Sequence, residues 1–109
     1  RGYAMSPKFE TPSSLNVQTE LDCFYYSSTV GQTNTIYVNA NTASHPVTSS
    51  NATTIKTRAV FEDFDAIGNV VNNMTLTSSK PYITLTHDVG SNAFATQFFG
   101  IKSLKVSYH

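Results

Sequence analysis

The chain has little charge. Only 14 of its 109 residues are charged, seven basic and seven acidic, so the formal net charge is zero. Attraction to a phosphate backbone needs an excess of basic side chains, and the five lysines do not cluster, so no binding of nucleic acid is predicted. The five glycines form no phosphate-binding loop, and no cofactor is expected.

Cysteine and long apolar runs are also scarce. The single cysteine, Cys23, excludes an internal disulfide, so packing and sheet hydrogen bonds must stabilise the fold. No apolar run approaches the roughly 18 residues of a membrane-spanning helix, so no transmembrane segment is predicted. The sequence starts at Arg1 instead of a methionine, which is typical of a processed or excised product.

Residues with hydroxyl or amide side chains are abundant, whereas charged residues are few. Ser, Thr and Asn account for 37 residues. Helix-forming Glu, Lys, Arg and Leu are few, whereas Thr, Val, Ile, Tyr and Phe are abundant, and this balance predicts an all-β chain. The same composition is typical of a secreted or cell-surface protein, so we predict an extracellular location. The length fits one domain, residues 1–109, with residues 1–12 expected to form an N-terminal arm or short strand.

Alternation with a period of two residues predicts the first strands. From Leu15 to Tyr26, apolar side chains occupy one phase and polar side chains the other, which predicts a long strand with Leu21 and Cys23 pointing inward. Ile36 and Val38 continue the inward face in a second, short strand. Both segments therefore have one face in the core.

Turn residues predict where the later strands begin and end. The polar stretch from Asn39 to Thr54 is expected to be a loop, or a loop that contains an edge strand, and a strand from Ile55 to Phe61 is expected to follow. The pair Gly68-Asn69 tolerates positive φ and is expected to close a hairpin. The phase is interrupted at Phe98-Phe99-Gly100, which predicts a β-bulge in the final strand, Phe94 to Tyr108.

These segments, with a strand from Tyr82 to Val89, give about seven strands with turns every ten to fifteen residues. That spacing predicts a single antiparallel β-sandwich, immunoglobulin-like in general shape. A partly open β-barrel is the second choice. No helix longer than one turn is expected.

No constellation of catalytic residues is evident, and the protein is predicted not to be an enzyme. The chain has no Gly-x-Ser-x-Gly motif, and Cys23 lies on an inward phase where its thiolate is disfavoured. No metal site is predicted. Asp63 and Asp65 are the candidates for calcium, but the bidentate ligand that an EF-hand loop needs is missing, and a solvated charged tip is the favoured interpretation.

The three histidines are the other residues that titrate near neutrality. His45 lies in the predicted loop and His109 ends the sequence. His87 shares a face with Leu85, and we expect it to be buried with one ring nitrogen bonded to the backbone. No two histidines have the spacing of a metal site.

Aromatic residues on polar strand faces are the main functional signal. Five residues on the solvent-facing phase form the predicted binding site: Phe24, Tyr26, Tyr37, Asn39 and Tyr82. A solvated face rarely needs so many rings. They are explained by a binding platform for a protein or glycan, by cover from the N-terminal arm, or by association into a homo-oligomer.

The leading hypothesis is a non-enzymatic, secreted or surface-displayed module that binds a protein or glycan or serves as a structural unit. The alternative is a small secreted effector, namely an antibacterial protein, a pore-forming protein or a protease inhibitor. The fold does not distinguish the two hypotheses, because one architecture carries many activities.

Overall fold

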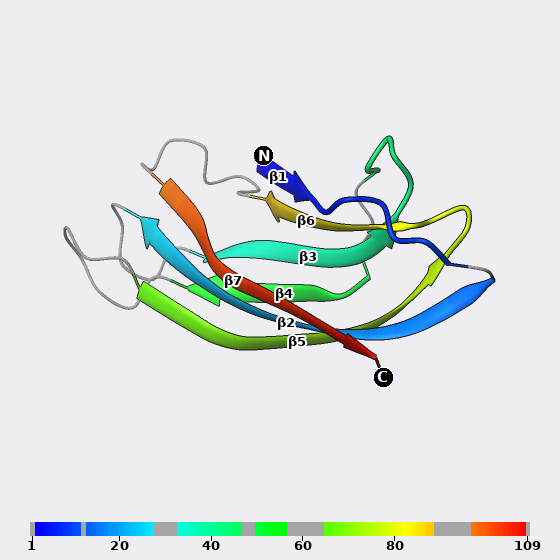
Figure 1. Cartoon of the computed structure of the whole chain (residues 1–109). Coiled ribbons are helices and arrows are strands. Elements are labelled where there is room, and N and C mark those ends of the chain that lie inside the picture. The colour runs from blue at the N-terminus through cyan, green and yellow to red at the C-terminus, as the bar shows by residue number, and fades with distance from the viewer. Residues whose placement is uncertain are drawn as a thin grey trace.

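Seven β-strands make up the computed structural model, which describes residues 2–11, 13–27, 33–46, 50–56, 65–88 and 97–108. Within these ranges there is no helix. The strands are β1 (Gly2–Met5), β2 (Ser14–Ser27), β3 (Thr33–Asn41), β4 (Ala52–Lys56), β5 (Asp65–Thr77), β6 (Tyr82–Asp88) and β7 (Gln97–Tyr108). The prediction of an all-β chain with about seven strands is confirmed (Figure 1).

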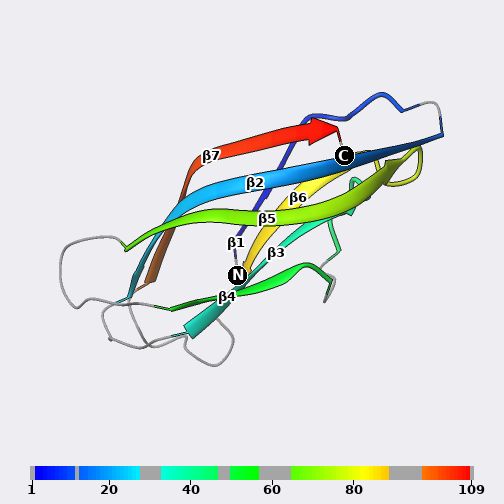
Figure 2. The same cartoon turned by 90° about the horizontal axis from the view of Figure 1, so that it is seen from below.

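The strands form two antiparallel sheets that lie in separate layers (Figure 2). One sheet has four strands in the order β1-β6-β3-β4, and the other has three in the order β5-β2-β7. They are not closed into a barrel, and this arrangement is consistent with the predicted β-sandwich. β1 and β7 are edge strands, and residues from both line a cavity at one side of the sandwich.

The core lies between the sheets, where the inward phases of the strands meet. Leu21 and Cys23 of β2 are buried as predicted, and they face the side chains of β3 and β6. Complete burial of a side chain the size of leucine stabilises the fold by about 1.5–3 kcal/mol. The buried apolar side chains are Val17, Leu21, Cys23, Tyr25, Ile36, Val38, Ile55, Val70, Leu76, Ile83 and Leu85.

The three-stranded sheet contains two β-bulges opposite the same step of β2. Between Leu21 and Cys23 the register shifts against β5, and between Asp22 and Cys23 it shifts against β7, which has Lys102 as its extra residue. The Asp22 carboxylate connects the two bulges. Its Oδ1 accepts a hydrogen bond from the Asn69 backbone N–H at 3.0 Å, and its Oδ2 accepts one from the Ser103 hydroxyl at 3.5 Å.

Glycine and a left-handed residue make the β5 bulge compatible with Asp22. A Cβ at Gly68 would lie 3.2 Å from Asp22 Oδ1, which is closer than most Cβ contacts. Asn69 has a φ of 59°, in the left-handed region that asparagine tolerates better than most residues. The backbone therefore turns its N–H toward the carboxylate at this point.

Two local predictions are wrong. Gly68-Asn69 does not close a hairpin, because both residues lie inside β5, whose pairing with β2 continues on either side of them. The bulge of the last strand is at Lys102 and not at Phe98-Phe99-Gly100, which pairs in register with β2. β3 continues to Asn41 and β4 already begins at Ala52, so both strands extend into the stretch predicted as a loop. Of the strand predicted from Ile55 to Phe61, only Ile55 and Lys56 are described, at the end of β4, and residues 57–64 lie outside the described part of the chain.

The N-terminal residues extend the four-stranded sheet. β1 pairs antiparallel with β6, so that Tyr3 lies opposite Thr86 and Met5 opposite Thr84. After β1, the Phe9 N–H donates to the Pro81 carbonyl at 2.9 Å. These residues form an edge strand and an extended continuation of it.

Replacing Asp22 by alanine is expected to lower the free energy of unfolding by about 1 kcal/mol, because the bulge loses a charged acceptor that is exposed to solvent. Asp22→Asn keeps an oxygen for the Asn69 N–H and should cost less. Glu20→Ala, on the same face of β2, is the matched control and should change stability by less than about 0.5 kcal/mol. Urea denaturation measures all three, and equal losses for Asp22→Ala and Glu20→Ala would contradict the role of the bulges.

Candidate functional site

The sandwich separates the five residues of the predicted binding site. Phe24 and Tyr26 of β2 lie on the outer face of the three-stranded sheet, because their neighbours in the strand point into the core. Tyr37 and Asn39 of β3 and Tyr82 of β6 lie on the outer face of the four-stranded sheet, on the opposite side of the molecule. The five residues therefore do not form one platform.

The group on the four-stranded sheet is partly covered by the chain that follows β3. Asn39 is only 6% exposed and its Oδ1 accepts a hydrogen bond from the Ser50 hydroxyl at 3.0 Å. Asn41 donates to the Pro46 carbonyl at 2.8 Å and to the Thr84 hydroxyl at 3.0 Å. The predicted solvent-facing position of Asn39 is wrong, because Asn39 and the adjacent Thr84 are both buried within this network.

The group on the three-stranded sheet gains a third ring that the sequence did not single out. Phe98 of β7 pairs with Tyr26, and their ring centroids lie 6.0 Å apart at an interplanar angle of 40°. Phe98 is 54% exposed, whereas Phe24 and Tyr26 are half-buried. We call Phe24, Tyr26 and Phe98 the aromatic patch. Only the β2–β7 register reveals it, because Phe98 is far from β2 in sequence.

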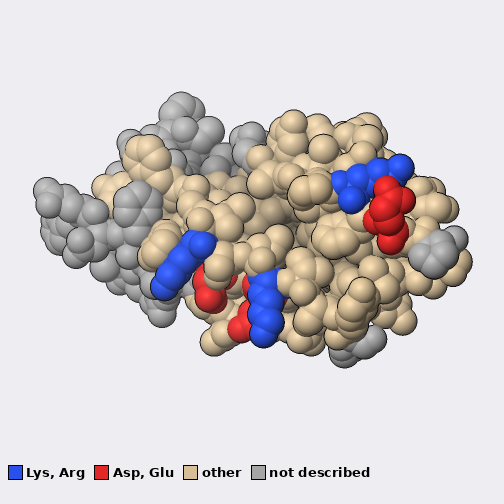
Figure 3. Space-filling model, in the orientation of Figure 1, with Lys and Arg blue, Asp and Glu red and all other residues tan. Residues whose placement is uncertain are grey.

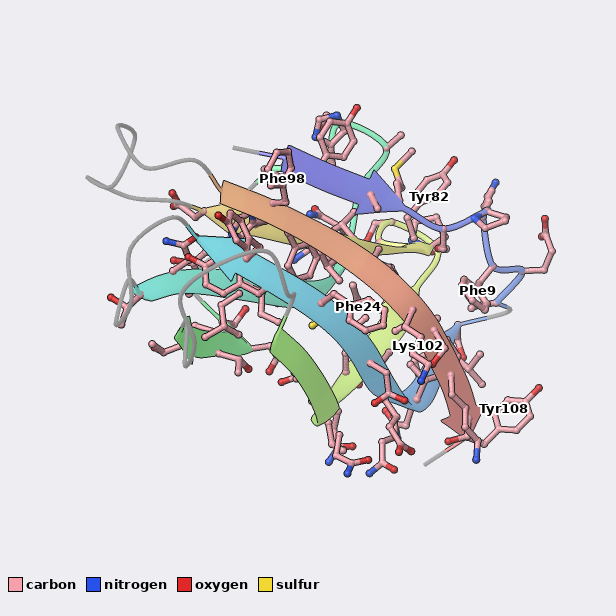
Figure 4. The ribbon with its side chains drawn as sticks, turned by 90° about the vertical axis from the view of Figure 1, so that its left-hand side faces the viewer. Phe9, Phe24, Tyr82, Phe98, Lys102 and Tyr108 are labelled. Carbon is pink, nitrogen blue, oxygen red and sulfur yellow. The ribbon has the colours of Figure 1, made fainter. Side chains whose placement is uncertain are left out.

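The space beside Phe24 is open. Gly100 lies opposite Phe24 in β7, and a Cβ placed on it would have no atom within 4 Å. Figure 4 shows Phe98 near the start of β7, Lys102 further along it with Phe24 of β2 to one side, and Tyr108 at its far end. Because Gly100 has no side chain, a flat ligand can approach the aromatic patch over this position.

Charged groups around the patch are few and of mixed sign. Lys105 of β7 lies opposite Glu20 of β2, and Lys102 follows Ile101 at the bulge beside Asp22. Figure 3 shows this face as mostly uncharged, with lysine and acidic side chains lying near each other. Such a surface favours neutral ligands over strongly charged ones.

The other candidate residues carry no reactive site among the described residues. Asp63 lies outside these residues, and Asp65 begins β5, where only its backbone is described. In the described ranges, no three His, Cys, Asp or Glu side chains are grouped to hold a metal ion. Burial, assisted by the negative charge of Asp22, raises the pKa of the Cys23 thiol to about 11, so the reactive thiolate is disfavoured at neutral pH.

His87 is buried as expected, but its partner is a side chain. Its Nε2 lies 2.9 Å from Asn34 Oδ1, and its ring stacks on Phe99 with centroids 5.0 Å apart. Burial lowers the pKa of His87, the positive amino terminus acts in the same direction, and Asp88 opposes them. His45 stacks on Tyr3 with centroids 3.9 Å apart, and His109 is not among the described residues.

Comparison with known proteins gives no relative. No protein-family model, no curated protein and no solved structure matches this chain. The residues that the structure describes include no helix that is long and apolar enough to cross a membrane. The functional argument therefore comes from the surface itself.

Proposed function

We propose that this protein is a non-enzymatic, extracellular module that binds a neutral glycan through the aromatic patch. The observation that carries the proposal is the close pair of Tyr26 and Phe98, with Phe24 beside the open position at Gly100. Extracellular placement is supported by composition alone, through the abundance of Ser, Thr and Asn.

The chemistry of the patch suits a sugar ring. The apolar C–H face of a pyranose packs against aromatic rings, and neighbouring polar groups then bond its hydroxyls. Asp22 lies two residues from Phe24 on the same outer face of β2, and Ser103 lies across from Asp22. Two rings held by antiparallel strands form a rigid surface, which reduces the entropy lost on binding.

The distribution of charge favours a neutral glycan over an anionic one. Lys105 lies opposite Glu20, and Lys102 lies close to Asp22 along β7, so neither lysine stands on a basic surface. An anionic polysaccharide would meet carboxylates next to both of these lysines. Salt should therefore change the binding little.

Replacing Phe98 by alanine is expected to weaken glycan binding at least tenfold, because the most exposed ring of the patch is lost. Retention of the wild-type protein on cellulose, chitin and xylan, followed by titration with oligosaccharides of the retained polymer, measures the change. Tyr26→Ala should act in the same direction. Both variants should stay folded and lose no more than about 1 kcal/mol of stability, because neither residue lies in the core.

Tyr108→Ser is the matched control, because this tyrosine is 83% exposed and lies at the far end of β7 (Figure 4). Binding by this variant should equal that of the wild type. Equal losses in the Phe98→Ala and Tyr108→Ser variants would contradict the role of the patch. Failure of the wild type to bind any of the three polymers or any sugar on a glycan array would overturn the proposal.

A further inference from the structure

A second, separate site lies between the edge strands of the two sheets. A cavity of about 260 Å³ opens between β1, β6 and β7 and is lined by Tyr3, Ala4, Leu85, His87, Phe99 and Ile101. Its walls are mostly apolar, and it lies on the inner side of β7, away from the aromatic patch. Tyr3 and Ile101 are both exposed in part, so the cavity is accessible from solvent.

The tautomer of His87 determines which ring nitrogen can accept a hydrogen bond from a ligand in the cavity. Asn34 Nδ2 donates a hydrogen bond to the Thr33 carbonyl at 2.6 Å, which fixes the side-chain amide with its oxygen toward His87. An amide oxygen only accepts, so the Nε2 of His87 must carry the hydrogen. In the neutral ring the other nitrogen, Nδ1, is then an acceptor.

Nδ1 of His87 has no hydrogen-bond partner among the described residues. His87 is 8% exposed, and among the described residues that line the cavity it has the only side-chain nitrogen. The lowered pKa of His87 keeps the ring neutral and Nδ1 unprotonated at neutral pH. An acceptor that has no protein partner and belongs to a residue lining a cavity can accept a hydrogen bond from a donor that a ligand brings in.

We infer that this cavity binds a small aromatic molecule that carries a single N–H or O–H donor, with the donor bonded to Nδ1 of His87. An engineered apolar cavity of about 150 Å³ holds benzene, so a volume near 260 Å³ suits a fused two-ring molecule such as an indole. Phe99 presents an aromatic wall, and Tyr3 lies at the opening.

The contacts around Tyr3 keep the opening ordered. The Tyr3 ring stacks on His45 at 21°, and β1 is held by its pairing with β6. Phe99 stacks on the His87 ring at 23°, which fixes the orientation of the imidazole. The Phe99 ring and the imidazole are therefore in place before a ligand enters, so ligand binding requires little ordering of the protein.

Indole and 1-methylindole are matched probes, since they share the fused ring and only indole has an N–H. Titration followed by backbone amide NMR shifts should show saturable binding of indole at residues around His87 and Phe99. The 1-methylindole affinity should be about fivefold to tenfold lower, as expected for one lost hydrogen bond. Equal affinities for the two probes, or no saturable shift with indole, would overturn the inference.

Two variants separate the anchor from the cavity. His87→Leu fills the position of the imidazole with an apolar side chain and removes the acceptor Nδ1. The preference for indole over 1-methylindole should therefore disappear. Ala4→Phe places a larger side chain at the exposed edge strand and should weaken both probes by at least tenfold, without relying on the stability of a variant at a buried position. Undiminished indole binding by Ala4→Phe would place the ligand elsewhere and overturn the inference.

A second apolar cavity of about 210 Å³ supplies an internal control. It lies toward the other end of β7 and is lined by Phe9, Leu15, Val17, Val106, Ser107 and Tyr108. None of these residues carries a side-chain nitrogen, and the two hydroxyl groups belong to the exposed residues Ser107 and Tyr108, so this cavity has no acceptor on a buried residue comparable to His87. Shifts confined to these residues, and equal for both probes, would also overturn the inference.

Discussion

Replacing Tyr25 by alanine is expected to lower the free energy of unfolding by about 3–5 kcal/mol, as for other large buried aromatic side chains. Tyr25 is fully buried and is the largest side chain of the core. Its ring meets the ring of His87 edge-on, with centroids 5.9 Å apart, and so connects β2 to β6 across the sandwich. Chemical denaturation of the purified variant measures the loss.

The neighbouring residue gives a matched control. Tyr26 is the next residue of the same strand and has the same side chain as Tyr25. It lies on the outer face of the sheet, where it is half-buried. Tyr26→Ala should therefore cost no more than about 1 kcal/mol. Losses of similar size at the two positions would show that the two faces of β2 do not differ as the structure describes.

Lowering the pH from 7 to 5 is expected to destabilise the protein through His87. The pKa of His87 in the folded state is lowered from its ordinary value of 6.5 because the ring is buried, so the unfolded chain binds the proton first. Stability is therefore fully present above pH 6.5 and falls as the pH drops toward the lowered pKa. The slope approaches about 1.4 kcal/mol per pH unit, the limit for one proton.

Urea denaturation at several pH values, for the wild type and two variants, isolates this effect. His87→Leu should lose this contribution to the slope between pH 6.5 and pH 5, whereas His45→Gln should keep it. Asn34→Ala leaves the Nε2–H without its acceptor and should cost about 1–3 kcal/mol at pH 7. A wild-type slope that persists unchanged in His87→Leu would refute the assignment.

The inward phases of the strands were predictable from sequence because they follow from backbone geometry alone. Side chains two residues apart share a face, so the alternation around Leu21, Cys23 and Leu85 identified the core before any pairing was known. The same argument placed Phe24 and Tyr26 on an outer face. It could not say which sheet each strand joins, and so it combined Tyr37 and Tyr82 with them.

Bulges and turns were not separable at the level of sequence. Gly68-Asn69 has the residues of a tight turn, and positive φ at Asn69 serves a bulge equally well. Only the continued pairing of β5 with β2, some 50 residues earlier in the chain, decides between them. Phe98 was missed for the same reason, because its proximity to Tyr26 depends on strand register.

Burial of the amide side chains was the other feature that local patterns could not predict. Asn39 and Asn41 lie on the phase that alternation assigns to solvent, yet both are buried. Their hydrogen bonds to Ser50, Pro46 and Thr84 satisfy the polar groups that burial would otherwise leave unpaired. Such a network is specific to the path of the chain between β3 and β4.

The order of strands in the three-stranded sheet also governs how quickly the chain can fold. β2 lies at its centre, but its neighbours are β5 and β7, so neither of its ladders can form by a local hairpin. Closing such long loops before any contact forms is slow, and folding times of milliseconds to seconds are typical of these topologies. While the chain is being synthesised, the edge of β2 that pairs with β7 must stay without its partner strand until residues 97–108 have been added.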